Sequence, residues 1–162
     1  MRSKLLLLAA AALAGCASFQ PLEPGKARLA DVEARFGKPL ERVALPDGGS
    51  RTFYSTLPEG RENFAVTAGA DGVVREIRQQ LTWDSIKRIT PNATSAKDLR
   101  ELLGPPFRVV RMERQQRDVW EYPWRLSEDR RILWVQVSYD GTVREVIEMH
   151  DYESDPPSGP KD

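Results

Sequence analysis

The chain has 162 residues, of which 40% are hydrophobic and 30% are charged, and its 24 basic and 24 acidic side chains cancel at neutral pH. This length allows one ordinary domain or two very small ones. The balanced charge argues against a general nucleic-acid binder, because phosphate contacts need a surplus of Lys and Arg. A single cysteine and a single histidine exclude a disulfide framework and an ordinary Cys/His zinc site. The sequence therefore predicts a small globular protein without a metal or other bound cofactor.

Residues 1–15 have the pattern of a secretory leader. Arg2 and Lys4 are followed by nine consecutive apolar residues, Leu5–Leu13. As a helix this run spans roughly 13 Å, which is too short for a hydrocarbon core of about 30 Å. A basic start, a short apolar run and small residues after it are typical of a cleaved signal peptide.

The leader ends in Leu13-Ala14-Gly15-Cys16, which resembles a bacterial lipobox. In that motif the cysteine is acylated and becomes the new N-terminus, so the resemblance implies a covalent lipid on Cys16. The alternative is a plain signal peptide with an incidental cysteine. Position 17 is alanine, not the aspartate that retains such lipoproteins in the inner membrane. By the same resemblance we expect the protein in the outer membrane, lipid-anchored and facing the periplasm.

Cleavage before Cys16 leaves 147 residues with 22 basic and 24 acidic side chains. Such a mildly acidic chain does not bind anionic lipid surfaces by bulk charge, so the acyl chains provide the attachment. Each buried CH₂ contributes about 0.8 kcal/mol, and several chains together make the anchor durable. Residues 16–24 are expected to form the lipidated N-terminus and a short stalk.

The remaining chain contains an internal repeat. Phe36-Gly37-Lys38-Pro39 aligns with Leu103-Gly104-Pro105-Pro106 at an offset of 67, and Asp71–Ile77 aligns with Asp140–Val146 at an offset of 69. Matches in the same order predict a duplication rather than chance similarity. We place the first copy at residues 25–82 and the second at residues 83–153. Residues 154–162, rich in proline, are predicted to be a disordered tail.

Each copy begins with a short predicted helix that carries apolar residues at helical spacing and ends at a glycine. The apolar positions are Leu29, Val32 and Phe36 in the first copy and Leu99, Leu102 and Leu103 in the second. Gly37 and Gly104 are the expected stops. Ser95 and Asp98 fit a capping box, whereas Arg28 stands at the equivalent of Ser95, so the first helix is expected to lack this cap.

After each helix the sequence turns to strand-forming segments. The predicted strands are Leu40–Leu45, Arg51–Ser55, Phe64–Ala68, Val73–Thr82, Phe107–Arg114, Asp118–Trp124, Arg131–Tyr139 and Val143–Met149. Asp71-Gly72 and Asp140-Gly141 predict tight hairpins, whose strands must be antiparallel. The predicted fold class is α+β, with two tandem αβββ(β) repeats, each a short helix packed on an antiparallel sheet. Because one such unit is near the lower limit for a self-sufficient core, we expect the two to dock through the apolar connector Leu81–Pro91.

This arrangement resembles the BamE/SmpA family of small outer-membrane lipoproteins. The resemblance rests on the lipobox, a Pro-Gly, helices that end in Phe-Gly-x-Pro or Leu-Gly-x-Pro, and the Asp-Gly hairpins. It covers nearly all of Pro21–Asp151, in two copies where the best-known members have one. It implies an accessory protein–protein interaction role in assembling the envelope or its β-barrel proteins.

A tandem of such units also resembles the β-lactamase-inhibitory protein, whose two lobes form a concave sheet that grips an enzyme. The alternative function is therefore that of a periplasmic inhibitor or ligand-binding protein. We assign no binding residue of either family to a position in this chain.

An aromatic run supplies the candidate partner-binding residues. Trp120, Tyr122 and Trp124 share one face of a predicted strand, and Trp134 is a candidate to join them across the ladder. Trp and Tyr are frequent anchors of protein interfaces, but the same residues also fill the cores of small lobes, so both interpretations stay open. Pro123 favours an edge strand or a strand end, where an incoming strand can add.

The strand Arg131–Tyr139 divides its side chains between two faces. We expect the alternate residues Leu133, Val135, Val137 and Tyr139 to face the core under the helix, which places Trp134 on the other face.

Catalysis finds little support in the sequence. His150 lies beside Asp151 in a predicted strand end, and no nucleophile motif, phosphate loop or metalloprotease pattern is present. The chain is therefore predicted not to be an enzyme, and no small-molecule substrate is evident.

Overall fold

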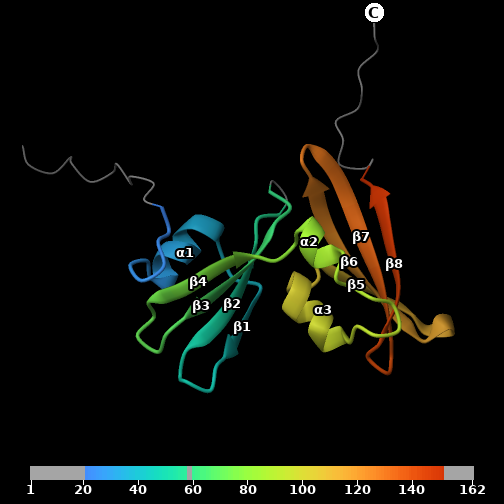
Figure 1. The fold of residues 1–162 in the computed structure, drawn as a ribbon, viewed down its shortest axis with the longest axis horizontal. Coiled ribbons are helices and arrows are strands. Elements are labelled where there is room, and N and C mark those ends of the chain that lie inside the picture. Colours follow the sequence, from blue (N-terminus) through green and yellow to red (C-terminus); the bar gives the residue numbers. More distant parts are fainter. Residues whose placement is uncertain (1–20, 58–59, 152–162) are drawn as a thin grey trace, which may run out of the picture.

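The computed structural model describes residues 21–57 and 60–151 and contains two successive units of helix and antiparallel sheet (Figure 1). The first unit comprises α1 (Leu29–Phe36), β1 (Glu41–Ala44), β2 (Ser50–Ser55), β3 (Asn63–Ala68) and β4 (Val74–Gln79). The second comprises α2 (Trp83–Ile86), α3 (Ala96–Leu103), β5 (Arg108–Met112), the 3-10 helix η1 (Glu113–Gln115), β6 (Arg117–Leu126), β7 (Asp129–Ser138) and β8 (Val143–His150). The α+β class with two tandem repeats is confirmed. The predicted leader, the lipidation site at Cys16 and the predicted tail fall outside the described residues.

The two sheets have the same topology, which supports a duplication. Their strand orders are β1-β2-β3-β4 and β5-β6-β7-β8, and every neighbouring pair is antiparallel. Gly72 and Gly141 occupy equivalent turns, between β3 and β4 and between β7 and β8, with φ of +75° and +82°. In each unit an isolated bridge ties the start of the helix to the residue after that turn, Arg28 to Val73 and Ser95 to Thr142.

The helix starts differ as the sequence predicts. In α3 the Ser95 hydroxyl accepts a hydrogen bond from the Asp98 amide at 3.1 Å, and the Asp98 carboxylate accepts one from the Ser95 amide at 3.2 Å. In α1 the Asp31 carboxylate accepts the Arg28 amide at 2.8 Å, but the arginine side chain makes no capping hydrogen bond. The first helix therefore has half of the box that the second has.

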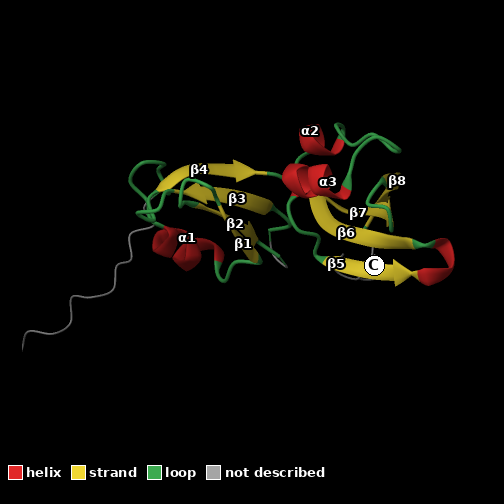
Figure 2. Cartoon of the chain, turned by 90° about the horizontal axis from the view of Figure 1, so that it is seen from below, coloured by secondary structure: helices red, strands yellow, loops and turns green. Residues whose placement is uncertain are grey.

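α1 lies alongside the first sheet, and α3 lies between the first sheet and the second (Figure 1). The core of the first unit lies between α1 and its sheet and is formed by Ala27, Val32, Tyr54, Val66 and Val74. The core of the second unit lies between its helices and its sheet and includes Leu81, Ile86, Ile89, Leu99, Leu103, Tyr122, Trp124, Leu133, Val135, Val137 and Val143. The two sheets do not join into one (Figure 2).

The face of the first sheet that is turned away from α1 packs against α3. Phe53 and Ala65 are opposite one another on this face, and both are buried. Asn63 lies two residues before Ala65 on the same face, and its side-chain amide donates to the carbonyl of Leu103 at 3.1 Å. That bond satisfies one of the carbonyls that the end of a helix leaves without an intrahelical partner.

Polar side chains continue this interface along α3. The Gln80 amide donates to the Glu101 carbonyl at 2.9 Å, and the Glu101 carboxylate pairs with Arg51 at 2.6 Å. Arg100 forms an ion pair with Glu41 of β1. The apolar side of α3 therefore packs in the second core, and its polar side contacts the first sheet. Through these contacts the two units are docked.

Three sequence expectations need correction at strand ends. β4 ends at Gln79 rather than at Thr82, because the Thr82 hydroxyl instead caps α2 by accepting the Ser85 amide at 3.2 Å. β5 ends at Met112, because Glu113–Gln115 forms η1. Tyr139, expected in the core, is 53% exposed because β7 ends one residue before it.

Candidate functional site

The strand register separates the four candidate aromatic residues. Trp120, Tyr122 and Trp124 alternate along β6, and all three face α2 and α3. Trp134 lies directly opposite Glu121, and residues that face each other across a ladder share a side of the sheet. Trp134 therefore lies on the other face, as its position within β7 predicts, and the expectation that it joins the aromatic run is wrong.

Two of the aromatic residues are part of the core. Tyr122 and Trp124 are both fully buried. The Tyr122 hydroxyl donates to the Gly104 carbonyl at 3.1 Å, and burial raises the pKa of this phenol. The Trp124 ring stacks on Trp83, with centroids 6.1 Å apart and planes inclined by 1°. The core interpretation thus holds for these two side chains, which hold α2 and the end of α3 on the sheet.

Trp120 lies beside the most exposed apolar strand among the described residues. It is half-buried and sits opposite Val109 of β5, with the Arg100 guanidinium 5.9 Å from its ring centroid. Among the described strands β5 is an edge strand, because it pairs with β6 alone. Phe107, Val109 and Val110 are 59%, 50% and 43% exposed. We call Phe107, Val109 and Val110 the β5 edge.

The first unit repeats this exposure at its own edge. Leu40 directly precedes the edge strand β1, and Val43 lies in it. They correspond to Phe107 and Val110 at the offset of 67, and they are 51% and 42% exposed. Edge strands in native proteins are usually short or protected by charged side chains, because a free edge invites another strand. β1 and β5 are both short and carry charged side chains, such as Arg42 and Arg111, but each also exposes apolar side chains at equivalent positions.

Pro123 lies at the point where β6 loses its neighbour. β6 as a whole is an interior strand, but its pairing with β5 stops at Glu121. Beyond that residue β6 pairs with β7 alone among the described strands, so the missing amide of Pro123 costs no ladder bond on its other side. The sequence expectation of an edge is met locally, although not for the strand as a whole.

The outer face of the second sheet, turned away from α3, carries Trp134 at its centre. The Trp134 indole donates to the Glu121 carboxylate at 3.0 Å, and the same carboxylate pairs with Arg108 at 2.8 Å. Ile132 and Ile147 flank the tryptophan and are half-buried. No helix among the described elements covers this face (Figure 1).

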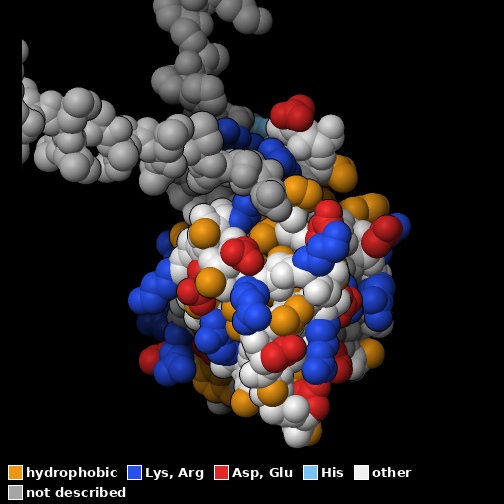
Figure 3. Space-filling view, turned by 90° about the vertical axis from the view of Figure 1, so that its left-hand side faces the viewer, with side chains coloured by type: hydrophobic (Ala, Val, Ile, Leu, Met, Phe, Trp, Pro, Cys, Tyr) orange, Lys and Arg blue, Asp and Glu red, His pale blue; other side chains and the backbone are white. Residues whose placement is uncertain are grey.

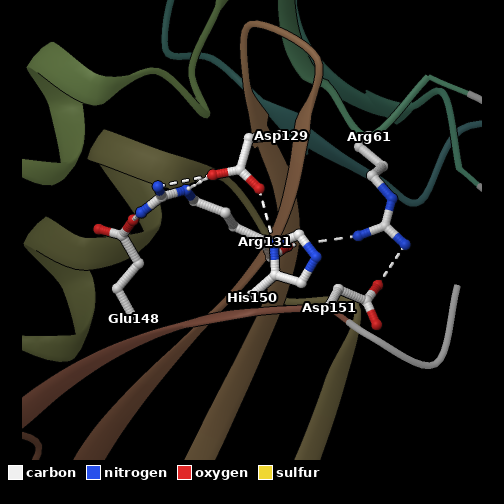
Figure 4. Close-up of polar contacts among 6 residues, drawn as sticks. All are labelled: Arg61, Asp129, Arg131, Glu148, His150 and Asp151. Carbon is white, nitrogen blue, oxygen red and sulfur yellow. Dashed lines mark hydrogen bonds and ion pairs between the residues drawn. The ribbon is translucent and has the colours of Figure 1, made fainter. Parts of the chain in front are cut away.

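A polar cluster occupies one end of β7 and β8 (Figure 4). The Asp129 carboxylate lies 2.7 Å from the His150 Nδ1 and accepts the Arg131 Nε–H at 2.7 Å, and Arg131 also pairs with Glu148. The hydrogen bond from Arg131, aided by that with His150, holds the pKa of Asp129 below its usual value. These contacts tie the ends of the neighbouring strands β7 and β8 together.

The same cluster joins the two units. Arg61, between β2 and β3, forms a buried ion pair with Asp151 and donates to the Arg131 carbonyl at 3.3 Å (Figure 4). Sequence reasoning did not identify this contact, because the two partners are 90 residues apart and neither lies in a recognisable motif. His150 is the last residue of β8, in the strand end where the sequence places it.

In the part of the chain that the structure describes, no group of three His, Cys, Asp or Glu side chains is arranged to hold a metal ion. None of the described helices has the length and apolar character needed to cross a membrane.

Comparison with known proteins adds little. No protein-family model and no curated protein matches the chain. Among solved structures it is similar to a DUF4309 family protein (YjgB) from Bacillus subtilis, at 21% identity and a TM-score of 0.32, covering 82% of this chain and 84% of that one. A likeness of this strength bears no weight in assigning a function.

Proposed function

We propose that this chain is a lipid-anchored periplasmic protein of the outer membrane that acts as a protein–protein interaction module in envelope assembly, with a tandem BamE/SmpA-like organisation. The β5 edge carries the proposal. It offers a free strand with apolar side chains on both faces, beside the half-buried Trp120. Such an edge binds an extended segment by adding a strand to the sheet.

The partner that fits this edge is an extended segment of an unfolded outer-membrane β-barrel protein. Barrel strands alternate apolar and polar residues and have unpaired backbone groups until the barrel closes. A strand added at β5 pairs those groups and meets the apolar side chains of Val109 and Val110. The lipid on Cys16, implied by the lipobox, keeps the module at the membrane into which barrels insert.

The rival function, an inhibitor that grips an enzyme with one concave sheet, has less support. That mode needs a binding surface that runs across both lobes. Here each unit has its own four-stranded sheet and α3 lies between them. Two of the candidate binding aromatics of the second unit, Tyr122 and Trp124, are buried in its core.

Site-specific photo-crosslinking in cells tests the proposal. A photo-reactive amino acid at Val109 is expected to trap unfolded barrel proteins or a barrel-assembly component. The same probe at Tyr139, which is equally exposed but lies outside the β5 edge, is the matched control. Val109→Asp combined with Val110→Asp is expected to lower outer-membrane protein levels as a deletion does, whereas Tyr139→Asp leaves them normal. If Val109 traps no such protein and a deletion strain keeps normal outer-membrane protein levels, the assembly role is refuted.

The anchor is tested separately by mass spectrometry of the purified protein. An acylated N-terminal Cys16 is expected, and Cys16→Ala is expected to release the protein from the membrane fraction. An unmodified N-terminus downstream of Cys16 refutes the lipoprotein assignment without affecting the β5 edge.

A further inference from the structure

The two sheets differ in whether a helix covers the face opposite their own helix. In the first unit this face is covered by α3, the helix of the next repeat, through Phe53, Ala65 and the bond from Asn63. The equivalent face of the second sheet, with Trp134 at its centre, has no such cover among the described elements (Figure 1). Each repeat therefore has an equivalent docking face, but among the described elements only the face of the first sheet is covered.

The strand registers define which residues correspond. The contact face of the first sheet has Glu41, Phe53 and Ala65 in line across three strands, and the second sheet has Arg108, Glu121 and Trp134 in the same places. Two changes stand out. An acidic residue is replaced by a basic one, and the small Ala65 is replaced by the largest side chain available.

The corresponding helix changes in the opposite sense at the charged position. At the offset of 67, Arg100 and Glu101 of α3 correspond to Glu33 and Ala34 of α1. In the first interface Arg100 pairs with Glu41. On the second sheet Arg108 takes the place of Glu41, and on α1 Glu33 takes the place of Arg100. The two charges of the pair are therefore exchanged. Glu101 of α3, whose carboxylate pairs with Arg51 of the first sheet, corresponds to the small Ala34 of α1.

The outward side of α1 is available for such a contact. α1 buries Val32 against its own sheet, while Glu33 and Ala34 are exposed. Glu33 pairs with Arg42 at 2.9 Å with both side chains close to half exposed. Figure 3 views this end of the molecule, where charged side chains of both signs lie among scattered apolar ones.

We infer that the outer face of the second sheet binds α1 of a second copy of this chain, in the way that the first sheet binds α3. Charge complementarity between Glu33 and Arg108, which reverses the Arg100–Glu41 pair of the first interface, selects a second copy rather than an unrelated helix. This contact joins two different surfaces, so it is heterologous and leaves one free α1 and one free sheet face at the ends. The expected product is a short head-to-tail array, and the inference does not depend on the proposed function.

Sedimentation of the purified full-length protein over a range of concentrations tests the inference. The wild type is expected to form dimers and longer species in a concentration-dependent series. Glu33→Arg and Arg108→Glu are each expected to weaken association about tenfold, because each places like charges opposite one another. Arg108→Glu is made together with Glu121→Gln, because the buried Glu121 would otherwise face a second carboxylate. Combining Glu33→Arg with Arg108→Glu/Glu121→Gln restores opposite charges between the two copies and is expected to regain wild-type association. Glu113→Arg, an exposed charge reversal in η1, is the matched control and leaves association unchanged.

Photo-crosslinking identifies the surface directly. A photo-reactive amino acid at Ala34 is expected to yield a crosslink to a second copy near Trp134, whereas the same probe at the exposed Lys87 yields none. A chain that stays monomeric at every concentration overturns the inference. So does an oligomer that is insensitive to both single reversals, or a crosslink from Ala34 to a different protein only. Circular dichroism of each variant separates loss of association from loss of fold.

Discussion

Replacing Arg61 with methionine tests how strongly the two units are coupled. The Arg61 guanidinium and the Asp151 carboxylate form an ion pair across the interface, with side chains only 9% and 7% exposed. Arg61→Met removes the cation and leaves Asp151 in a site with little water. Removing one partner of a buried pair costs about 3 kcal/mol or more, whereas replacing both with apolar residues is often neutral. We therefore expect Arg61→Met to be strongly destabilising and Arg61→Met/Asp151→Leu to recover most of the loss.

Urea unfolding followed by two probes measures this effect. All four tryptophans lie at or after Trp83, so their fluorescence reports on the second unit, whereas far-ultraviolet circular dichroism reports on both. In the wild type the two transitions should coincide, because the units are docked. With a denaturant dependence of about 2 kcal/mol per molar urea, Arg61→Met should lower the midpoint by about 1.5 M and separate the two transitions. Coincident transitions with an unchanged midpoint in Arg61→Met would refute the argument that this pair couples the units.

Three further predictions concern single features of the fold. Leu99→Ala empties a fully buried position of the second core and should cost about 2–5 kcal/mol in urea unfolding. Ser95→Ala removes the cap of α3 and should cost about 1 kcal/mol, while Arg28→Ser should supply the missing cap of α1 and raise its protection in hydrogen exchange. Hydrogen bonds from Ser138 and Thr142 lower the pKa of Asp140 from 3.8 to about 2, so its contribution to stability is complete above pH 4 and declines as the pH falls toward 2. Asp140→Asn should remove that part of the acid dependence of the urea midpoint, and an unchanged dependence would contradict it.

Local patterns in the sequence were enough to predict the elements of each repeat. A glycine after an apolar stripe ends each helix, and the Asp-Gly pairs form the last hairpin of each sheet, because these features depend on backbone conformation within a few residues. The capping difference between Arg28 and Ser95 was predictable for the same reason. The ends of the strands were less predictable from the sequence. Glu113–Gln115 became a 3-10 turn, and Tyr139 fell beyond the end of β7, where the strand gives way to the turn.

The register and the packing of the units could not be predicted from such patterns. That Trp134 faces away from Tyr122 depends on which residues of β6 and β7 are opposite one another, and a shift of one residue would reverse it. The Arg61–Asp151 pair and the place of α3 between two sheets depend on contacts between distant parts of the chain. A single sequence contains no signal for them beyond the repeat itself.

The repeat explains why the surfaces of the second unit differ from those of the first. A duplicated unit starts with two equal docking faces, but in the tandem chain one of them is covered by the neighbouring helix. On the covered face Ala65 is small and Glu41 is matched to Arg100, as contact with α3 requires. The open face was released from that requirement and now has Trp134 over a buried, paired Glu121. An exposed sheet face with no partner has no need of a tryptophan held in place by a buried carboxylate. Burying the Glu121 carboxylate costs desolvation free energy, and this cost argues that the face is built for contact.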